Sequence, residues 1–200
     1  MSLFLKMDYF EKNLLKRSKE FHDTTSSNGA NPQMLDVAEK IISGLRLVHA
    51  KGYLHMDLKP ANILLRIRHG KVEDAVLADF GLARELTKGK AGKNEGQCGT
   101  FPYKLCHDTH YTNKYDIWSL GVVFFHIVEC ITRRSDVTYM ELVEVIKDAK
   151  QGKVEGRLAG FDEKLRNLIL LCFTPDLEQR PCSEDLYSFI LSVNTHTHIK

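Results

Sequence analysis

Residues 53–65 read YLHMDLKPANILL, and residues 79–81, seventeen positions after Asn62, read DFG. Transfer of a phosphoryl group from a nucleotide requires a carboxylate that orients the attacking hydroxyl, a cation that neutralises the moving charge, and oxygen ligands for magnesium. Asp57 can be the carboxylate and Lys59 the cation. The amide of Asn62 and the aspartate of DFG can be the two ligands, so the two stretches together predict a phosphoryl-transfer site.

The neighbouring segments predict how the loop that carries Asp57 is mounted. Apolar residues at three- and four-residue steps indicate an amphipathic helix that begins at Asn31-Pro32 and runs to about Ala50. Residues 63–65 and 75–78 are short apolar runs on either side of a turn, which predicts a small β-hairpin. A loop held between a helix and a hairpin has the rigidity that catalysis by positioning requires.

The C-terminal half of the sequence predicts helices that pack around one buried helix. Residues 117–128 are apolar almost all round, which is typical of a helix covered on most faces. Residues 139–146, 163–173 and 183–193 each show helical periodicity. The expected fold is therefore mainly α (α+β): a helical bundle around a buried central helix, with a small β-hairpin beside the loop of Asp57.

The composition favours a soluble globular protein. Of the 200 residues, 43% are hydrophobic and 27% are charged. Lys and Arg number 28 against 26 Asp and Glu, so neither a nucleic-acid nor a membrane partner is expected. The five cysteines are odd in number and form no CxxC pair, which favours a reducing compartment. We expect a cytoplasmic location, with the nucleus as an open alternative.

Residues 53–65 and 79–81 resemble the catalytic loop H-R-D-L-x-x-x-N of protein kinases and the magnesium-binding D-F-G that follows it. The likeness continues in residues 98–103 (CGTFPY, the end of a kinase activation segment), 116–121 (DIWSLG, the start of the buried central helix) and 172–181 (CFTPDLEQRP, a late motif with an Arg). Lys59 and Thr100 are similar to those of the Ser/Thr type. The resemblance implies a Ser/Thr protein kinase that transfers the γ-phosphate of ATP to protein hydroxyls.

The resemblance implies roles for the residues around the phosphates. Asp57 would be the catalytic base, and Lys59 would contact the γ-phosphate. Thr100 would bridge these two side chains and shape the groove for the protein substrate. Asn62 and Asp79 would bind Mg²⁺, so ATP and Mg²⁺ are the expected cofactors.

The resemblance also implies an adenine pocket on the other side of the loop. Met7 would lie at its back, and the backbones of Asp8 and Phe10 would pair with the adenine edge. Lys59 and Asn62 would hold the phosphate end of the same nucleotide. Leu64 would form the floor of the pocket, although it fits an ordinary core leucine equally well.

Other positions are expected to support the site or depart from the family pattern. His55 would pack the loop against DFG, and Asp116 would hold the loop by hydrogen bonds to its backbone. Met56 stands where many kinases carry an Arg that pairs with a loop phosphate, so switching by loop phosphorylation is not expected. The family's Ala-Pro-Glu is replaced, which would leave Arg180 without its carboxylate, with Asp108 or solvent as alternatives.

Residues 1–200 are expected to be a single partial kinase domain, with residues 1–7 as the last N-lobe strand, 8–13 as the hinge and 14–200 as the C-lobe. The resemblance also implies a Gly-rich loop and a strand Lys before the hinge, and no Gly-x-Gly-x-x-Gly occurs in the sequence. This chain alone is therefore expected to bind ATP weakly and to turn it over poorly or not at all. A protein partner could cover the surface that faces the N-lobe. Three outcomes stay open: a kinase completed by further residues or a partner, an inactive kinase-like binding or scaffold module, and a product that does not fold stably.

Overall fold

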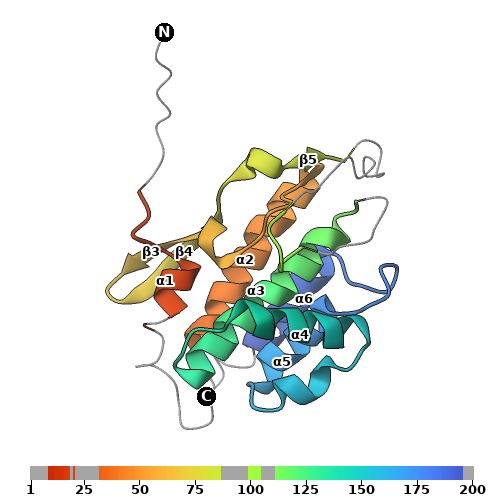
Figure 1. The fold of residues 1–200 in the computed structure, drawn as a ribbon. Coiled ribbons are helices and arrows are strands. Elements are labelled where there is room, and N and C mark those ends of the chain that lie inside the picture. The colour runs from red at the N-terminus through yellow and green to blue at the C-terminus, as the bar shows by residue number, and fades with distance from the viewer. Residues whose placement is uncertain (1–8, 19, 21–31, 87–98, 105–110, 196–200) are drawn as a thin grey trace.

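The computed structural model describes residues 9–18, 20, 32–86, 99–104 and 111–195. Over these ranges the chain forms a helical bundle with a small antiparallel sheet beside it (Figure 1). The helices are α1 (Leu14–Ser18), α2 (Pro32–Ala50), α3 (Lys114–Arg133), α4 (Tyr139–Lys150), α5 (Glu163–Cys172) and α6 (Ser183–Thr195). Short 3-10 turns are η2 (Pro60–Asn62), η3 (Phe80–Leu82) and η4 (Val154–Leu158). The mainly α class predicted from the sequence is confirmed.

The strands of the described residues form two antiparallel groups. One sheet has the order β1-β3-β4, and β2 pairs with β5. The strands are β1 (Lys12–Asn13), β2 (Tyr53–Leu54), β3 (Ile63–Arg68), β4 (Lys71–Leu77) and β5 (Arg84–Glu85). The predicted hairpin is β3–β4, and its turn places His69 and Gly70 at positive φ angles of 51° and 77°. The other strands were not predicted, because two residues are too few to show an alternating pattern.

Helix α2 forms where the apolar periodicity predicts it. Ile41, Ile42 and Leu45 are at most 1% exposed and face the core. The helix ends before Gly52, whose φ of 77° a glycine adopts without a steric penalty and whose N–H donates to the His49 carbonyl at 2.9 Å. The predicted Asn31 cap and the predicted N-terminal strand lie outside the described residues.

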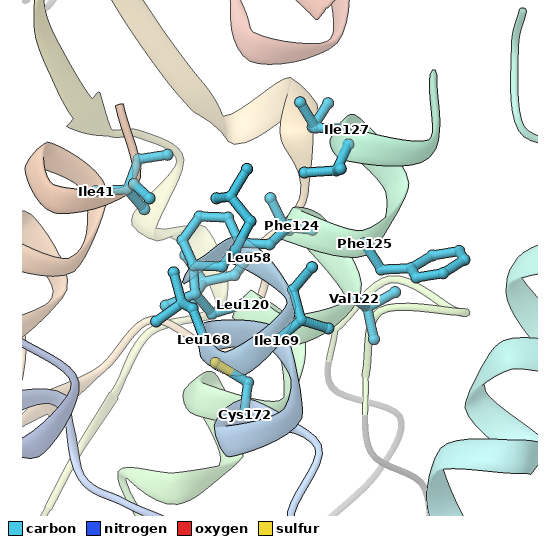
Figure 2. Packing of buried hydrophobic residues seen from close by; sticks show 14 of the residues in the cluster. Ile41, Leu58, Leu120, Val122, Phe124, Phe125, Ile127, Leu168, Ile169 and Cys172 are labelled. Carbon is cyan, nitrogen blue, oxygen red and sulfur yellow. The ribbon is translucent and has the colours of Figure 1, made fainter. Parts of the chain in front are cut away.

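Helix α3 is the buried central helix, and it extends beyond the predicted 117–128 at both ends. Trp118 and Phe124 are 0% exposed. Figure 2 shows Phe124 and Leu120 packed in one cluster with Leu168 and Cys172 of α5. The loop that carries Asp57 thus rests on a helix that is fixed by packing on most sides.

The apolar composition of α3 has a second consequence. Among the helices of the described residues, α3 is the one long and apolar enough to cross a bilayer by length and composition. However, 89% of its most apolar window is buried inside the fold. A core helix passes the same test, so its position in the core accounts for its composition.

Gly121 lies at a close approach of α3 to the end of α5. A Cβ atom at this position would lie 2.7 Å from the Cβ of Cys172 and 3.0 Å from the ring of Phe173. We expect Gly121→Ala to lower the free energy of unfolding by about 1–3 kcal/mol, because two packed helices must move apart. Urea unfolding measures this change. Gly160→Ala is the matched control, since an added Cβ there meets nothing within 4 Å; equal stability of the two variants would contradict the prediction.

Candidate active site

The loop of residues 55–59 is fixed from beneath by one buried carboxylate. Asp116, in the first turn of α3, accepts hydrogen bonds from the backbone N–H of His55 at 2.8 Å and of Met56 at 2.9 Å. Its side chain is 0% exposed. These are the backbone bonds that the sequence predicts for Asp116, so its positioning of the loop is confirmed.

His49 supports the same carboxylate and was missed by the sequence analysis. Its Nε2 lies 2.9 Å from Asp116 Oδ2, to which it donates as N–H, and its Nδ1 forms a hydrogen bond of 3.0 Å with the Ser183 hydroxyl. His49 and Ser183 are each 4% exposed, so this chain of hydrogen bonds joins α2, α3 and α6 inside the fold. Nothing in the sequence near His49 distinguishes it from an ordinary helix-end histidine.

Asp57, Lys59 and Thr100 form a closed set of hydrogen bonds, which we call the Asp57 triangle. Lys59 Nζ donates to Asp57 Oδ2 at 2.7 Å and to Thr100 Oγ1 at 2.9 Å. Thr100 Oγ1 donates to Asp57 Oδ1 at 2.6 Å. The sequence places Thr100 forty-three residues from Asp57, and the fold brings the two side chains into contact as expected.

Gly99 explains how Thr100 approaches the loop so closely. Its φ is +84°, and a Cβ atom would lie 2.6 Å from the carbonyl oxygen of Met56. Glycine is therefore the residue that fits both the backbone conformation and the space. The following Phe101–Pro102 bond is cis.

The carboxyl group of Asp57 has a pKa below its ordinary value. Burial raises the pKa of Asp57, because the charge loses hydration, but hydrogen bonds from Lys59 and Thr100 lower it by more. The side chain is 6% exposed. Asp57 is therefore an ionised carboxylate at neutral pH, which is the state required of a proton acceptor.

The lowered pKa of Asp57 predicts a contribution to stability that is lost in acid. A depressed carboxyl pKa stabilises the fold above the unfolded-state value of about 3.9, and this contribution disappears as the pH falls through the folded-state pKa. We expect the unfolding free energy of the wild type minus that of Asp57→Asn to be constant from about pH 5 to 7 and to shrink below about pH 4. Urea unfolding at several pH values measures this margin. A margin that does not change in acid would contradict the prediction.

Asn62 links the Asp57 triangle to the second loop. Its Nδ2 donates to the carbonyl oxygen of Asp57 at 2.9 Å and to Asp57 Oδ2 at 3.0 Å. The backbone carbonyl oxygen of Asn62 accepts a hydrogen bond from the backbone N–H of Ala78 at 2.9 Å. Asp79 is the next residue, is exposed, and has a left-handed φ of 62°. The backbone bond from Ala78 therefore joins Asn62 to the residue before Asp79, and the joint binding of Mg²⁺ by Asn62 and Asp79 stays a prediction.

His55 fastens the second loop from the other side. Its Nε2–H donates to the Ala78 carbonyl at 2.9 Å, and its Nδ1 accepts from the N–H of Asp57 at 3.3 Å. The His55 ring also lies 4.7 Å from the ring of Phe80. These contacts confirm the predicted packing of His55 against DFG.

The residues predicted to bind Mg²⁺ have the chemistry that this ion prefers. Asn62 uses its amide nitrogen on Asp57, so its amide oxygen is not engaged by those bonds. Asp79 adds an exposed carboxylate. Mg²⁺ is usually held by one or two such ligands together with phosphate oxygens and water, so a larger protein cage is not needed. The described residues contain no cluster of three or more His, Cys, Asp or Glu.

The residues predicted for the adenine side are only partly described. Leu64 is half-buried, whereas its neighbours Ile63 and Leu65 are 0% exposed, so Leu64 belongs to the opposite face of β3 from the core residues. The ring of Phe10 contacts the Arg66 guanidinium at 5.1 Å, a contact that the sequence does not predict. Met7 and Asp8 lie outside the described residues. The proposed roles of all four in nucleotide binding stay predictions.

Two departures from the family pattern have structural counterparts. Met56 is 2% exposed, so its side chain fills apolar space in the core. The expectation that loop phosphorylation does not switch the chain stays a prediction. Arg180 is 2% exposed, so the suggestion that it reaches solvent is wrong. Its guanidinium donates to the carbonyls of Thr174 and Lys114 at 2.9 and 3.1 Å and lies 4.9 Å from the Trp118 ring. Asp108 lies outside the described residues.

The turn that carries Thr100 is tied to the central helix by a partly buried polar pair. The Tyr103 hydroxyl donates to Nδ1 of His126 at 2.7 Å. Burial raises the pKa of Tyr103 and lowers the pKa of His126, which favours the neutral phenol and the neutral imidazole. A lone His within an apolar helix indicates that His126 needs a partner, since buried polar groups are usually hydrogen-bonded, but it does not indicate that Tyr103 is that partner.

The family of the chain follows from comparison with known proteins. A family model described as the protein kinase domain matches residues 1–189. The chain therefore belongs to the protein kinase family, whose domains generally use ATP and Mg²⁺ and act on protein substrates.

Proposed function

We propose that this chain is a Ser/Thr protein kinase domain, which transfers the γ-phosphate of ATP to Ser or Thr hydroxyls of other proteins. The observation that carries the proposal is the Asp57 triangle, in which a buried and ionised carboxylate is held by an ammonium and a hydroxyl. Such an arrangement is suited to positioning and deprotonating an alcohol.

Each residue of the site has a task that its contacts support. The Asp57 carboxylate accepts the proton of the attacking hydroxyl, and Lys59 places a positive charge beside it. When bound, Mg²⁺ would neutralise phosphate charge, and Asn62 and Asp79 would hold it. The hydrogen bond that Asn62 donates to the loop and the one that Asp116 accepts from it keep the loop in one geometry, which reduces the entropy lost on reaching the transition state.

The preference for Ser and Thr rests on Lys59 and Thr100. The triangle that they complete with Asp57 is the feature shared with the Ser/Thr type. We propose on the same basis that residues 8–13 are a hinge between an N-lobe strand at 1–7 and a C-lobe at 14–200.

The nucleotide side of the proposed site is less complete than the substrate side. The 200 residues contain no Gly-x-Gly-x-x-Gly sequence to cover the phosphates. We propose that residues 1–200 alone bind Mg²⁺-ATP weakly and that a protein partner covers the face on the nucleotide side. The same observation favours a second candidate, an inactive kinase-like module that binds partners without phosphoryl transfer.

The chemistry also favours a setting and a kind of partner. Cys130, Cys172 and Cys182 are free thiols in the described part of the chain, which is typical of a reducing compartment. We propose a cytoplasmic location. With a net charge of +2, the partners we propose are proteins rather than nucleic acids or membranes.

One experiment separates the two candidates. The chain is incubated with Mg²⁺ and γ-labelled ATP in the presence of casein, and the labelled amino acids are identified. Phosphoserine and phosphothreonine that depend on Mg²⁺ are expected from the proposed kinase. A thermal shift with Mg²⁺-ATP but no labelled product would favour the binding module, and phosphotyrosine alone would overturn the Ser/Thr assignment.

A further inference from the structure

A groove of about 490 Å³ lies between helix α4 and the turn that follows Thr100. Phe101, Val143 and Ile146 give it an apolar lining. Phe101 is the residue next to Thr100, whose hydroxyl donates to Asp57, so the groove begins one residue from the Asp57 triangle. A molecule in the groove would therefore lie beside the proposed site of phosphoryl transfer.

Among the residues that the structure describes, the charged side chains that line the groove are all of one sign. They are Lys104, Lys147 and Lys150, and no described Asp or Glu lines it. Lys147 and Lys150 are exposed and Lys104 is half-buried. Within the described ranges, none of the three forms an ion pair with a carboxylate. The three lysines thus form a positive rim and can pair with carboxylates of a bound molecule.

The acidic residues of α4 are engaged elsewhere or lie off the groove. Glu141 forms the capping box with Thr138 and pairs with Arg133 at 2.6 Å. Asp148 pairs with Arg157 at 2.6 Å. Helix α4 has three acidic residues, Glu141, Glu144 and Asp148, and none of them lines the groove. The capping box also fixes the start of α4, which holds the lysines on a stable helix.

Apolar surface continues beyond the groove along the start of α4. Tyr139 is 54% and Met140 62% exposed, and the Tyr139 ring lies 5.4 Å from the 41% exposed ring of Phe101. Exposed apolar patches beside polar rims are typical of protein interaction sites. The partly buried hydrogen bond between Tyr103 and His126 ties the opposite wall to α3. Both walls are therefore anchored to the core.

We propose that this Lys-rimmed groove docks an acidic segment of the protein substrate that carries an apolar side chain. The apolar side chain fills the space against Phe101 and Val143, and carboxylates on either side of it pair with Lys104, Lys147 and Lys150. The proposal rests on the proposed kinase function, because it names the substrate class of the same site. Docking beside Thr100 raises the local concentration of a nearby Ser or Thr at Asp57.

The test measures binding in the absence of ATP, so it does not depend on activity. The probe is a fluorescein-labelled peptide with one leucine among glutamates, and fluorescence anisotropy gives its affinity for the full chain. We expect Lys147→Glu/Lys150→Glu to weaken binding roughly tenfold or more, because two attractions become repulsions. The matched control is Lys16→Glu/Lys71→Glu, which makes the same change of charge at exposed lysines of α1 and β4. The control variant is expected to bind like the wild type.

A second pair of probes tests the apolar part of the proposal. Replacing the leucine of the peptide by serine is expected to weaken binding severalfold, and raising the salt concentration is expected to weaken it further. Equal binding of the leucine and serine peptides, or equal loss in both charge variants, would overturn the proposal in favour of unspecific attraction to polyanions. Peptide binding without phosphoryl transfer to casein would support the docking groove and contradict the kinase function. Phosphoryl transfer to casein that is the same in the wild type and in Lys147→Glu/Lys150→Glu would support the kinase function and contradict the docking groove.

Discussion

Asp57→Asn is expected to lower the rate of phosphoryl transfer by about 10²–10⁴-fold while leaving the chain folded. The amide has nearly the shape of the carboxylate, but it has no charge and does not accept the proton of the attacking hydroxyl. In the wild type the carboxylate is ionised at neutral pH, since hydrogen bonds from Lys59 and Thr100 outweigh the effect of burial on its pKa. The substitution therefore removes the proton acceptor and leaves the Lys59 charge uncompensated.

The rate is measured with saturating Mg²⁺-ATP and a protein substrate, and circular dichroism reports the fold. Asp36→Asn is the matched control, because this aspartate is 54% exposed and pairs with Lys40 one turn along α2, away from the Asp57 triangle. The control variant is expected to keep the wild-type rate. A folded Asp57→Asn protein with undiminished transfer would refute the role of Asp57 as base, and the proposed function with it.

Residue order and spacing alone predict the part of the site that is built from adjacent residues, whereas the distant contacts of Thr100 and Asp116 with the loop were predicted through the resemblance to kinases. Asp57, Lys59 and Asn62 lie within one turn-sized loop, so their order along the chain almost fixes their geometry. The hairpin that follows was predictable for the same reason, because its strands are neighbours in sequence. Residues that are close together in the sequence have few possible arrangements in space.

The contacts that were not predictable join residues far apart in sequence. His49 reaches Asp116 and Ser183 across 67 and 134 positions. Tyr103 contacts His126 because the turn that follows Thr100 packs against α3. Arg180 satisfies its donors with backbone carbonyls, and no side-chain pattern signals a carbonyl as the acceptor. Such pairings depend on how elements pack, which periodicity does not encode.

Asp116→Ala is expected to lower the free energy of unfolding by roughly 3–5 kcal/mol. The substitution removes the acceptor of three buried donors: the N–H groups of His55 and Met56, and Nε2–H of His49. Each donor would stay inside the fold without a partner, at a cost of about 1–3 kcal/mol, or the loop would move to reach water. The first response appears as lost stability and the second as a displaced Asp57.

Urea unfolding and hydrogen exchange at the Met56 amide together distinguish these responses. Exchange at Met56 is expected to accelerate well beyond the change in global stability, because the bond to Asp116 protects this amide directly. Asp162→Ala is the matched control: it removes a carboxylate that caps α5 through the N–H of Lys164 and is expected to cost only about 1 kcal/mol. If the two variants unfold at the same urea concentration and exchange at Met56 is unchanged, Asp116 does not hold the loop. The bonds from Asn62 and His55 would then have to account for the position of Asp57 without it.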